Sequence, residues 1–359
     1  MGFLRFLLAA CVVGAHYEHP SYLPFIPGDL AVQFFFLLSG FYMALILKSN
    51  PNYSDRKIFY SARFARIYSS YFIYLILGFT ITLPRIIELE WSSLSIASLL
   101  IVVFSNLSIF GSDAIMFLEN STNSIGFDLT SNFRESEPQL HTFLIMPQAW
   151  SLPLELCFYL LIPFILKRKK VLVYLVALSI GSRFVSIVLY GNTDPWSYRF
   201  FPSELVFFLS GTFTYDLYLR LQNKSFFRRQ ESLDSRLRLA IVPTVCYLLF
   251  LIYQREYGLL PSSVSSSSFA SSIRPLTLFI LAVCLTPVIF SLSRDLKLDR
   301  ALGELSYPIY LGHLSVISLF ERINLSPSYF QVLVFSTVVA IVLSPVARIF
   351  ERRLNLIFS

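Results

Sequence analysis

The chain has 359 residues, of which 55% are hydrophobic and only 14% are charged. A soluble globular domain carries about 25% charged residues, so this composition, with its apolar residues gathered in long blocks, excludes an ordinary soluble enzyme and indicates a polytopic membrane protein. The net charge of +7 does not indicate a nucleic-acid partner, because the basic residues lie beside the apolar blocks, where they set the orientation of membrane spans.

Eleven apolar segments are candidate membrane spans, several of them near the minimum length. They cover residues 2–17, 30–48, 68–83, 94–110, 149–166, 171–190, 201–221, 239–257, 275–292, 306–320 and 331–350. The first segment has the charge pattern of a secretory signal. However, the apolar residues between Arg5 and Cys11 are too few for the core of such a signal, so we expect this segment to remain in the protein.

Basic loops alternate with acidic or neutral loops, as the positive-inside rule requires. Lys and Arg gather at 48–66, 167–170, 220–238, 294–300 and 348–353, whereas the external loops include 111–140, 191–197 and the Ser-rich stretch 262–272. The first two basic clusters should both be cytoplasmic, so an even number of spans must separate them. Three apolar segments lie between them, so 68–83 or 94–110 should be interfacial or re-entrant. We therefore predict an all-α polytopic fold with about ten transmembrane helices, that one extra segment and both termini in the cytoplasm.

Almost no chain remains for a soluble domain, so we expect a single transmembrane domain over residues 1–359. The four cysteines all lie within apolar blocks and lack the spacing of metal ligands, which is typical of small buried hydrophobic residues. We expect no metal site and no permanently bound cofactor.

Two pairs of polar residues lie within or beside predicted spans, where such side chains mark function by default. Arg5 and His16 are eleven residues apart, which places them on one helix face about 16 Å apart along the axis. His313 follows Tyr310 by one helical turn in a later span. The structural alternatives are a snorkelling Arg with a His at the outer interface, and a hydrogen-bonded packing His.

Three further charged residues, Glu155, Arg63 and Arg66, have both a functional and a structural interpretation. Glu155 has an almost uniformly apolar surround, and a lone buried carboxylate would tend to protonate, so we expect Arg5, Arg63, Arg66 or a His as its partner. Arg63 and Arg66 share one helix face, and two guanidinium groups there can bind phosphates in bidentate fashion. The alternatives are a purely structural ion pair for Glu155 and ordinary membrane anchoring for the two arginines.

At these residues the sequence resembles acyltransferase family 3, a family of membrane-bound acyltransferases, over nearly its whole length. Five motifs occur in the family's order: Arg-x10-His from Arg5 to His16, FFFLLSGF at 34–41, Arg63-x-x-Arg66 followed by Tyr68, WSLPLELCFY at 150–159 around Glu155, and SYPIYLGH at 306–313. Two departures matter. Gln33 stands where the family usually has an acid, with Asp29 nearby, and Leu156 stands where one variant has a second acid.

The resemblance implies that an acyl group, commonly acetyl from cytoplasmic acetyl-CoA, is transferred to a hydroxyl of a surface polysaccharide or a lipid-linked sugar at the bacterial inner membrane. It implies a role for each of seven residues: donor binding by Arg5, Arg63 and Arg66, general-base or covalent-relay chemistry by His16, orientation of a base or an ion pair with an Arg by Glu155, and hydrogen bonds to the oxyanion from Tyr310 and His313. The remaining partners would be membrane lipids, and no nucleic acid.

Two other classes of protein fit part of the pattern. A transporter or flippase of lipid-linked sugars also uses intramembrane His and Glu as proton relays, but the sequence has no inverted repeat of the kind that many transporters contain. A structural membrane protein would tolerate replacement of His16. Binding of acetyl-CoA distinguishes both alternatives from an acyltransferase.

Overall fold

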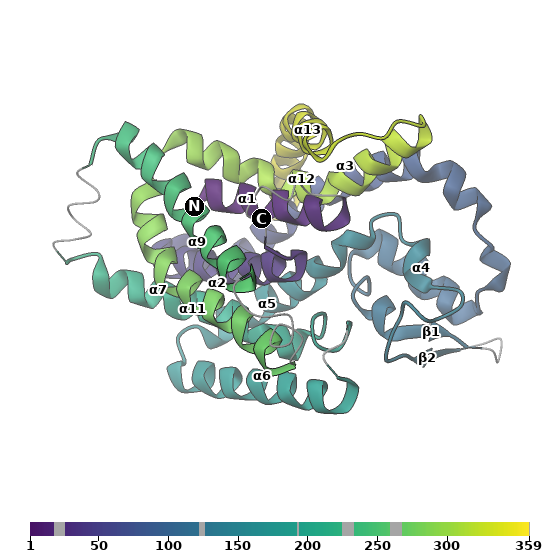
Figure 1. Cartoon of the computed structure of the whole chain (residues 1–359), viewed down its shortest axis with the longest axis horizontal. Coiled ribbons are helices and arrows are strands. Elements are labelled where there is room, and N and C mark those ends of the chain that lie inside the picture. The colour runs from purple at the N-terminus through teal and green to yellow at the C-terminus, as the bar shows by residue number, and fades with distance from the viewer. Residues whose placement is uncertain (18–25, 122–125, 192–193, 225–232, 259–267, 359) are drawn as a thin grey trace. The chain divides into compact units, whose positions relative to one another are not determined.

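The structure is a computed structural model that describes residues 1–17, 26–121, 126–191, 194–224, 233–258 and 268–358 (Figure 1). This part of the chain is mostly helical, and each predicted apolar segment overlaps an α-helix. The α-helices are α1 (Gly2–His16), α2 (Gly28–Ser49), α3 (Arg56–Glu88), α4 (Ile96–Ser108), α5 (Ser151–Ile165), α6 (Lys169–Tyr190), α7 (Phe201–Leu221), α9 (Ser235–Gly258), α11 (Ser268–Ser293), α12 (Lys297–Arg322) and α13 (Tyr329–Phe358).

The other regular elements are short. Strands β1 (Leu118–Asn120) and β2 (Phe127–Leu129) pair antiparallel, with Leu118 opposite Leu129. Five 3-10 helices are η1 (Pro51–Ser54), η2 (Trp91–Ser93), η3 (Ala114–Phe117), η4 (Leu140–Phe143) and η5 (Pro147–Trp150). Of the predicted loop at 262–272, residues 268–272 belong to α11, which begins at Ser268, and residues 262–267 lie outside the described part.

Several helices have the properties of membrane spans. Among the described residues, five are long and apolar enough to cross a membrane, namely α2, α3, η5 with α5, α6 and α13, and α1, α4 and part of α11 are shorter apolar helices. These helices confirm the all-α membrane fold, whereas the number of ten spans and the cytoplasmic termini stay predictions. Helix α4 has 13 residues and rises only about 20 Å, less than the ~30 Å hydrocarbon core. Its length favours α4 as the re-entrant or interfacial segment.

The chain forms two compact units, each built from stretches that are distant in sequence. The first unit contains Met1–Leu45, Ser210–Tyr310 and Pro327–Ile341. The second unit contains Ile46–Leu209, Leu311–Ser326 and Val342–Ser359. The prediction of a single domain over residues 1–359 stays a prediction.

In the first unit, α2 and α7 approach each other at the level of the backbone. A Cβ on Gly211 would lie 2.0 Å from the carbonyl oxygen of Leu37 and 2.9 Å from the carbonyl carbon of Gly40. Small residues permit such close packing of membrane helices. Beside this contact the ring of Phe41 packs edge-on against Phe290 of α11, with 4.9 Å between the ring centroids. The Gly and Phe that end the motif at 34–41 are therefore packing residues.

In the second unit, one buried amide joins three segments that lead to α5. Asn106 of α4 donates from Nδ2 to the carbonyl oxygen of Phe143 at 3.2 Å and accepts from the backbone N–H of Ile145 at 2.8 Å. The backbone carbonyl oxygen of Asn106 accepts from the hydroxyl of Tyr71 on α3 at 2.7 Å. Buried polar groups need such partners, and these bonds fix the stretch before η5 against α3 and α4.

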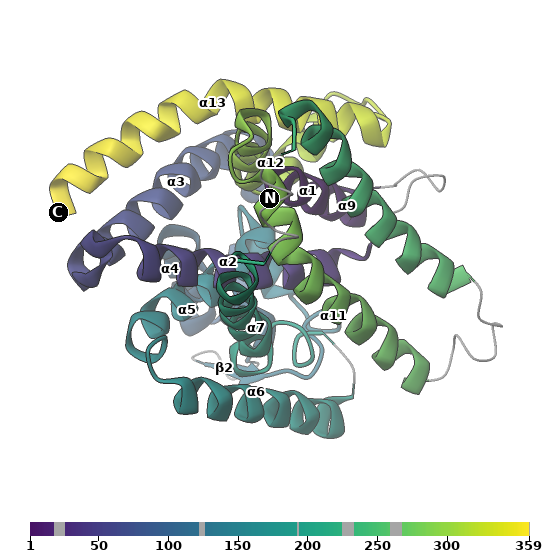
Figure 2. The ribbon, with the colours of Figure 1, turned by 90° about the vertical axis from the view of Figure 1, so that its left-hand side faces the viewer.

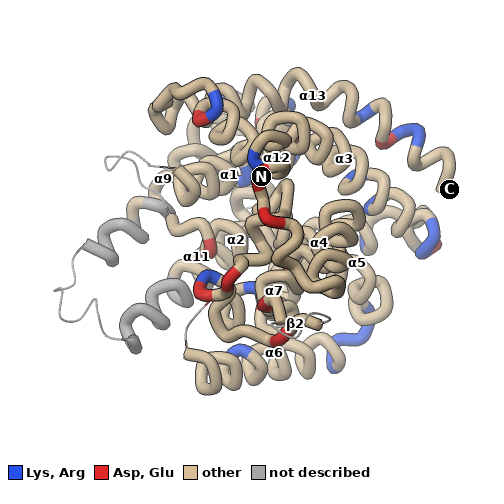
Figure 3. The backbone as a smooth tube through the Cα atoms, turned by 90° about the vertical axis from the view of Figure 1, so that its right-hand side faces the viewer, with Lys and Arg blue, Asp and Glu red and all other residues tan. Residues whose placement is uncertain are grey.

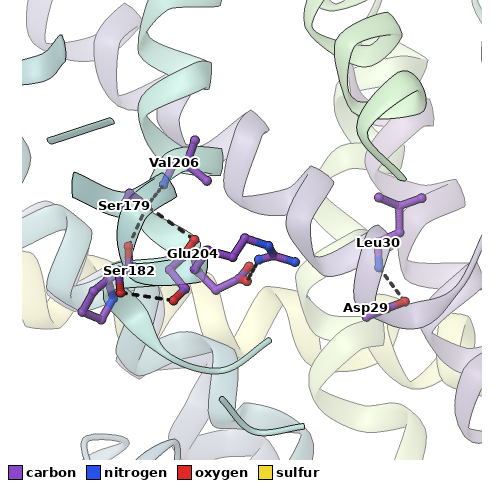
Figure 4. A network of polar contacts seen from close by, with 9 residues as sticks. Asp29, Leu30, Ser179, Ser182, Glu204 and Val206 are labelled. Atoms are coloured by element: carbon purple, nitrogen blue, oxygen red, sulfur yellow. Dashed lines mark hydrogen bonds and ion pairs between the residues drawn. The ribbon is translucent and has the colours of Figure 1, made fainter. Parts of the chain in front are cut away.

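Polar contacts also lock α6 to the first turn of α7 (Figure 4). The hydroxyl of Ser179 donates to the carbonyl oxygen of Pro202 at 2.6 Å and accepts from the N–H of Val206 at 2.8 Å. The hydroxyl of Ser179 thus contacts the two backbone groups that an α-helix pairs with each other. Ser182 and Ser203 are in contact at 3.3 Å between their hydroxyl oxygens.

The last turns of α13 lie against the first turns of α3 (Figure 2). The rings of Phe358 and Phe64 are 5.1 Å apart between their centroids. Arg352 and Arg353 are exposed on the same end of α13, where Figure 3 shows basic residues gathered. This end of α13 therefore adds positive charge next to the segment of α3 that follows η1.

Candidate active site

Helix α1 carries two of the predicted residues, Arg5 near its start and His16 as its last residue. The Nδ1–H of His16 donates to the carbonyl oxygen of Val12 at 3.0 Å. Because a carbonyl oxygen only accepts, this bond places the proton of the neutral ring on Nδ1 and makes Nε2 the basic nitrogen. A ring in this tautomer can take a proton from a hydroxyl group at Nε2.

Other elements of the first unit hold both ends of α1. The carboxylate of Asp299 on α12 accepts from the backbone N–H groups of Gly2 and Phe3 at 2.6 and 2.9 Å. Nearer the other end, the hydroxyl of Tyr329 on α13 donates to the carbonyl oxygen of Ala10 at 3.1 Å. The backbone of α1, and with it the position of its two polar side chains, is therefore fixed by α12 and α13.

Helix α12 carries the second predicted pair, Tyr310 and His313, one turn apart. Both are buried, with 6% and 0% of their surface exposed. The ring of Tyr310 packs against Phe35 of α2 at 6.5 Å between centroids. Beyond Tyr310, where α12 enters the second unit, Gln148 Nε2 donates to the carbonyl oxygen of Leu311 at 2.6 Å. Two buried polar groups one turn apart can stabilise an oxyanion that develops in a low-dielectric site.

Glu155 lies half-buried on α5, at a position that its neighbours fix well. Its carboxylate accepts a hydrogen bond from the hydroxyl of Tyr159, one turn further along. The ring of Trp150, just before α5, lies under the guanidinium of Arg199 at 4.2 Å, and Arg199 Nε in turn donates to Asp194 at 2.6 Å. The cationic partner expected for Glu155 stays a prediction.

Arg63 and Arg66 lie on α3, three residues apart as predicted. The guanidinium of Arg63 is half-buried and sits 6.0 Å from the ring centroid of Tyr53, whereas Arg66 is exposed. In the part of the chain that the structure describes, no acceptor bonds the buried Nε of Arg63, and no carboxylate pairs with either arginine. The two guanidinium groups therefore form a cationic site that an external anion can neutralise.

Sequence reasoning missed a pair of charges inside the predicted spans. Arg183 Nη1 on α6 lies 2.8 Å from Glu204 Oε1 on α7, and the carboxylate is fully buried. The signal was available, because each residue is a charge in an apolar stretch. Asp299 gave no comparable signal, since its partners on α1 lie almost a whole chain length away in sequence.

The departures from the family pattern have different surroundings. Gln33 is buried with 5% of its surface exposed. Asp29 is exposed in the first turn of α2, where its carboxylate accepts the N–H of Leu30 at 2.8 Å (Figure 4). The carboxylate of Asp29 thus contacts the backbone of its own helical turn.

The seven predicted residues are divided between the two units. The first unit holds Arg5, His16 and Tyr310, and the second holds Arg63, Arg66, Glu155 and His313. Helix α12 joins Tyr310 to His313, and convergence of all seven stays a prediction. Within the described ranges, no group of three or more His, Cys, Asp or Glu residues could hold a metal ion.

Comparison with known proteins gives one extensive match. A family model described as an acyltransferase domain, that of acyltransferase family 3, matches residues 1–348. An uncharacterized protein of Aquifex aeolicus (strain VF5) is 24% identical over 202 residues, which make up 54% of this chain and 80% of that protein. No solved structure matches the chain.

Proposed function

Because the chain belongs to acyltransferase family 3 and is a membrane acyltransferase, we propose that it moves acetyl from acetyl-CoA to a hydroxyl of a surface polysaccharide or a lipid-linked sugar. The protein would act in the bacterial inner membrane as a multi-pass enzyme and take its donor from the cytoplasm. The acyl-CoA is a substrate here, and the proposal includes no resident cofactor or metal.

The observation that carries this proposal is the cationic site on α3. Arg63 and Arg66 have no carboxylate partner among the described residues, and the Nε of Arg63 is buried without an acceptor. A buried donor without a partner costs about 1–3 kcal/mol, so an anion that accepts from it gains that free energy on binding. A planar guanidinium matches phosphate in bidentate geometry, and CoA carries a 3′-phosphate and a pyrophosphate.

The chemistry of transfer would use His16. Its Nε2 takes the proton of the acceptor hydroxyl as the oxygen attacks the thioester carbonyl. The tetrahedral intermediate then collapses with cleavage of the carbon–sulfur bond, and the CoA thiolate takes the proton back from the imidazolium. In the alternative, the imidazole itself attacks the thioester carbonyl and the CoA thiolate leaves, and the acyl-imidazole then passes the acyl group to the hydroxyl, whose proton goes to the thiolate. Tyr310 and His313 would donate hydrogen bonds to the oxyanion, and Glu155 would orient a base or pair with an arginine.

The proposal is tested on the full chain purified in detergent. We expect acetyl-CoA to bind more tightly than acetyl-dephospho-CoA, and acetyl-dephospho-CoA more tightly than acetyl-pantetheine, because each step removes phosphate. Release of free CoA thiol should depend on an added carbohydrate with free hydroxyls. Equal affinity for all three donors would overturn the phosphate site. A protein that binds donor but never releases thiol with any acceptor would favour the transporter.

A further inference from the structure

The N-terminal turn of α1 is held by an unusual set of contacts, all within the first unit. The Asp299 carboxylate accepts from the nitrogen of Met1 at 2.7 Å in addition to the N–H groups of Gly2 and Phe3. The first N–H groups of a helix have no partners within the helix itself. A single buried side chain, with 5% of its surface exposed, therefore supplies the acceptors that this helix end lacks. Its negative charge also complements the helix dipole.

Steric contacts fix the same turn. A Cβ on Gly2 would lie 1.5 Å from the backbone carbonyl oxygen of Asp299. A Cβ on Gly303, one turn later on α12, would lie 2.8 Å from the Cα of Gly2. Contacts this short leave room for glycine alone on both helices. The two backbones are therefore in direct contact, and α1 cannot slide along α12 without breaking the bonds to Asp299. We call this contact of Gly2 and Phe3 with Asp299 and Gly303 the seat of α1.

This seat connects the two helices of the first unit that carry candidate catalytic groups. The backbone of Arg5 follows the seated turn directly, since its N–H bonds the carbonyl oxygen of Met1 at 3.3 Å. His16 ends the same helix, and Tyr310 lies further along α12. A helix transmits a shift of its first turn along its whole length, and a misplacement of 1 Å can reduce a rate about 100-fold.

We propose that Asp299 is a positioning residue, which sets the height and direction of α1 on α12 and thereby places Arg5 and His16 relative to Tyr310. This inference rests on the proposed function, because Arg5 is assigned there to the donor and His16 to proton or acyl transfer. Asp299 itself touches neither substrate.

The test compares Asp299→Ala, Asp299→Asn and Gly2→Ala with the matched control Asp295→Asn. Asp295 lies four residues earlier and is 61% exposed, with only loose ion pairs to Arg238 and Arg294. For each purified variant, acetyl-CoA affinity, transfer rate at saturating donor per folded molecule, and the unfolding midpoint are measured. We expect Asp299→Ala and Gly2→Ala to lose at least about tenfold in rate, and Asp299→Asn to fall between them and the parent because one acceptor oxygen remains. Asp295→Asn should match the parent.

A merely structural role gives a different pattern, in which the midpoint falls but folded Asp299→Ala keeps the parent's rate and affinity. That result would overturn the inference. If Asp299→Ala does not fold, Asp299→Asn and Gly2→Ala decide by the same criterion. If the parent protein binds no acyl-CoA, the proposed function fails, and hydrogen exchange of α1 then tests the seat alone. Faster exchange in Asp299→Asn than in Asp295→Asn supports the seat, and equal exchange contradicts it.

Discussion

Two arginines of the second unit, Arg183 on α6 and Arg63 on α3, lie in long apolar helices but differ in their partners. Arg183 contacts the buried carboxylate of Glu204 at 2.8 Å. Arg63 faces the ring of Tyr53 at 6.0 Å, and in the described part of the chain nothing accepts from its buried Nε. A buried charge needs compensation, which the fold supplies for Arg183 and which the proposed function assigns to the bound donor for Arg63. We therefore expect the partner of an arginine on these helices, rather than its charge alone, to distinguish a structural residue from a binding residue.

The strongest test of this difference removes the partner of Arg183. Glu204→Ala leaves a guanidinium in the apolar region without its carboxylate, and breaking a buried pair costs about 3–5 kcal/mol. We expect a large loss of stability in detergent, measured as the free energy of unfolding. The double variant Arg183→Met/Glu204→Met should recover most of that loss, because no uncompensated charge remains. A Glu204→Ala protein as stable as the parent would show that this pair is not a structural one.

A second test separates binding from chemistry. His16→Ala should reduce transfer by roughly 100-fold or more, within the range for the loss of a general base. Donor affinity should change by no more than a few-fold, because His16 lies about 16 Å along α1 from Arg5. Arg5→Ala should instead weaken donor binding. Transfer at the parent rate in folded His16→Ala would exclude this residue as base or relay.

A smaller effect is expected when only the shape of the cation changes. Arg63→Lys and Arg66→Lys keep the positive charge, but an ammonium group cannot reproduce a bidentate fork. We expect acetyl-CoA affinity to fall by several-fold in each variant, measured by equilibrium binding. Membrane anchoring alone would be served equally well by Lys. Unchanged affinity in both variants would therefore assign the two arginines to anchoring.

The smallest expected effect concerns an imidazole that lies among arginines outside the predicted spans. Burial, and then the charges of Arg199, Arg134 and Arg85, lower the pKa of His141 from its usual 6.5 to about 4, against an opposing effect of Asp194. The unfolded chain therefore binds a proton between these pH values that the folded chain does not. The contribution of the neutral His141 ring to the free energy of unfolding is therefore complete above pH 6.5 and is lost as the pH falls toward 4.

The loss should be modest, roughly 1 kcal/mol, because solvent screens a partly exposed ring. It is measured as the change of the unfolding midpoint between pH 7.5 and pH 5. The His141→Asn variant lacks the titrating group and should lose less stability over that interval. Identical pH dependence in the parent and in His141→Asn would contradict the lowered pKa.

How much of the fold could be predicted depended on where polarity changes along the chain. The apolar segment 201–221 coincides with α7 (Phe201–Leu221), because both ends of that helix are marked by a change in composition. The predicted segment 68–83 covers only half of α3, which begins at Arg56. Hydropathy reports the apolar part of a helix and not the basic turns that precede it.

In the candidate site, pairs of residues on one helix could be predicted from the sequence, and contacts between distant helices could not. The pairs Arg5 with His16 and Arg63 with Arg66 each lie on one helix, which their spacing in apolar or basic stretches could indicate, whereas their roles stay predictions. The seat of α1 on Asp299 joins residues 297 positions apart. No periodicity reports a contact of that kind, because it arises only when helices pack.

The most direct test of the account measures acetyl-CoA affinity and unfolding midpoint together for Arg63→Gln and Arg183→Gln. Both substitutions remove one guanidinium from an apolar helix of the same unit. We expect Arg63→Gln to weaken donor binding at least about tenfold, since a charge-assisted hydrogen bond contributes about 1.5–3 kcal/mol, with little change of the midpoint. Arg183→Gln should lower the midpoint and leave the donor affinity of the folded protein within a few-fold. An Arg63→Gln protein that binds acetyl-CoA as tightly as the parent would contradict the account.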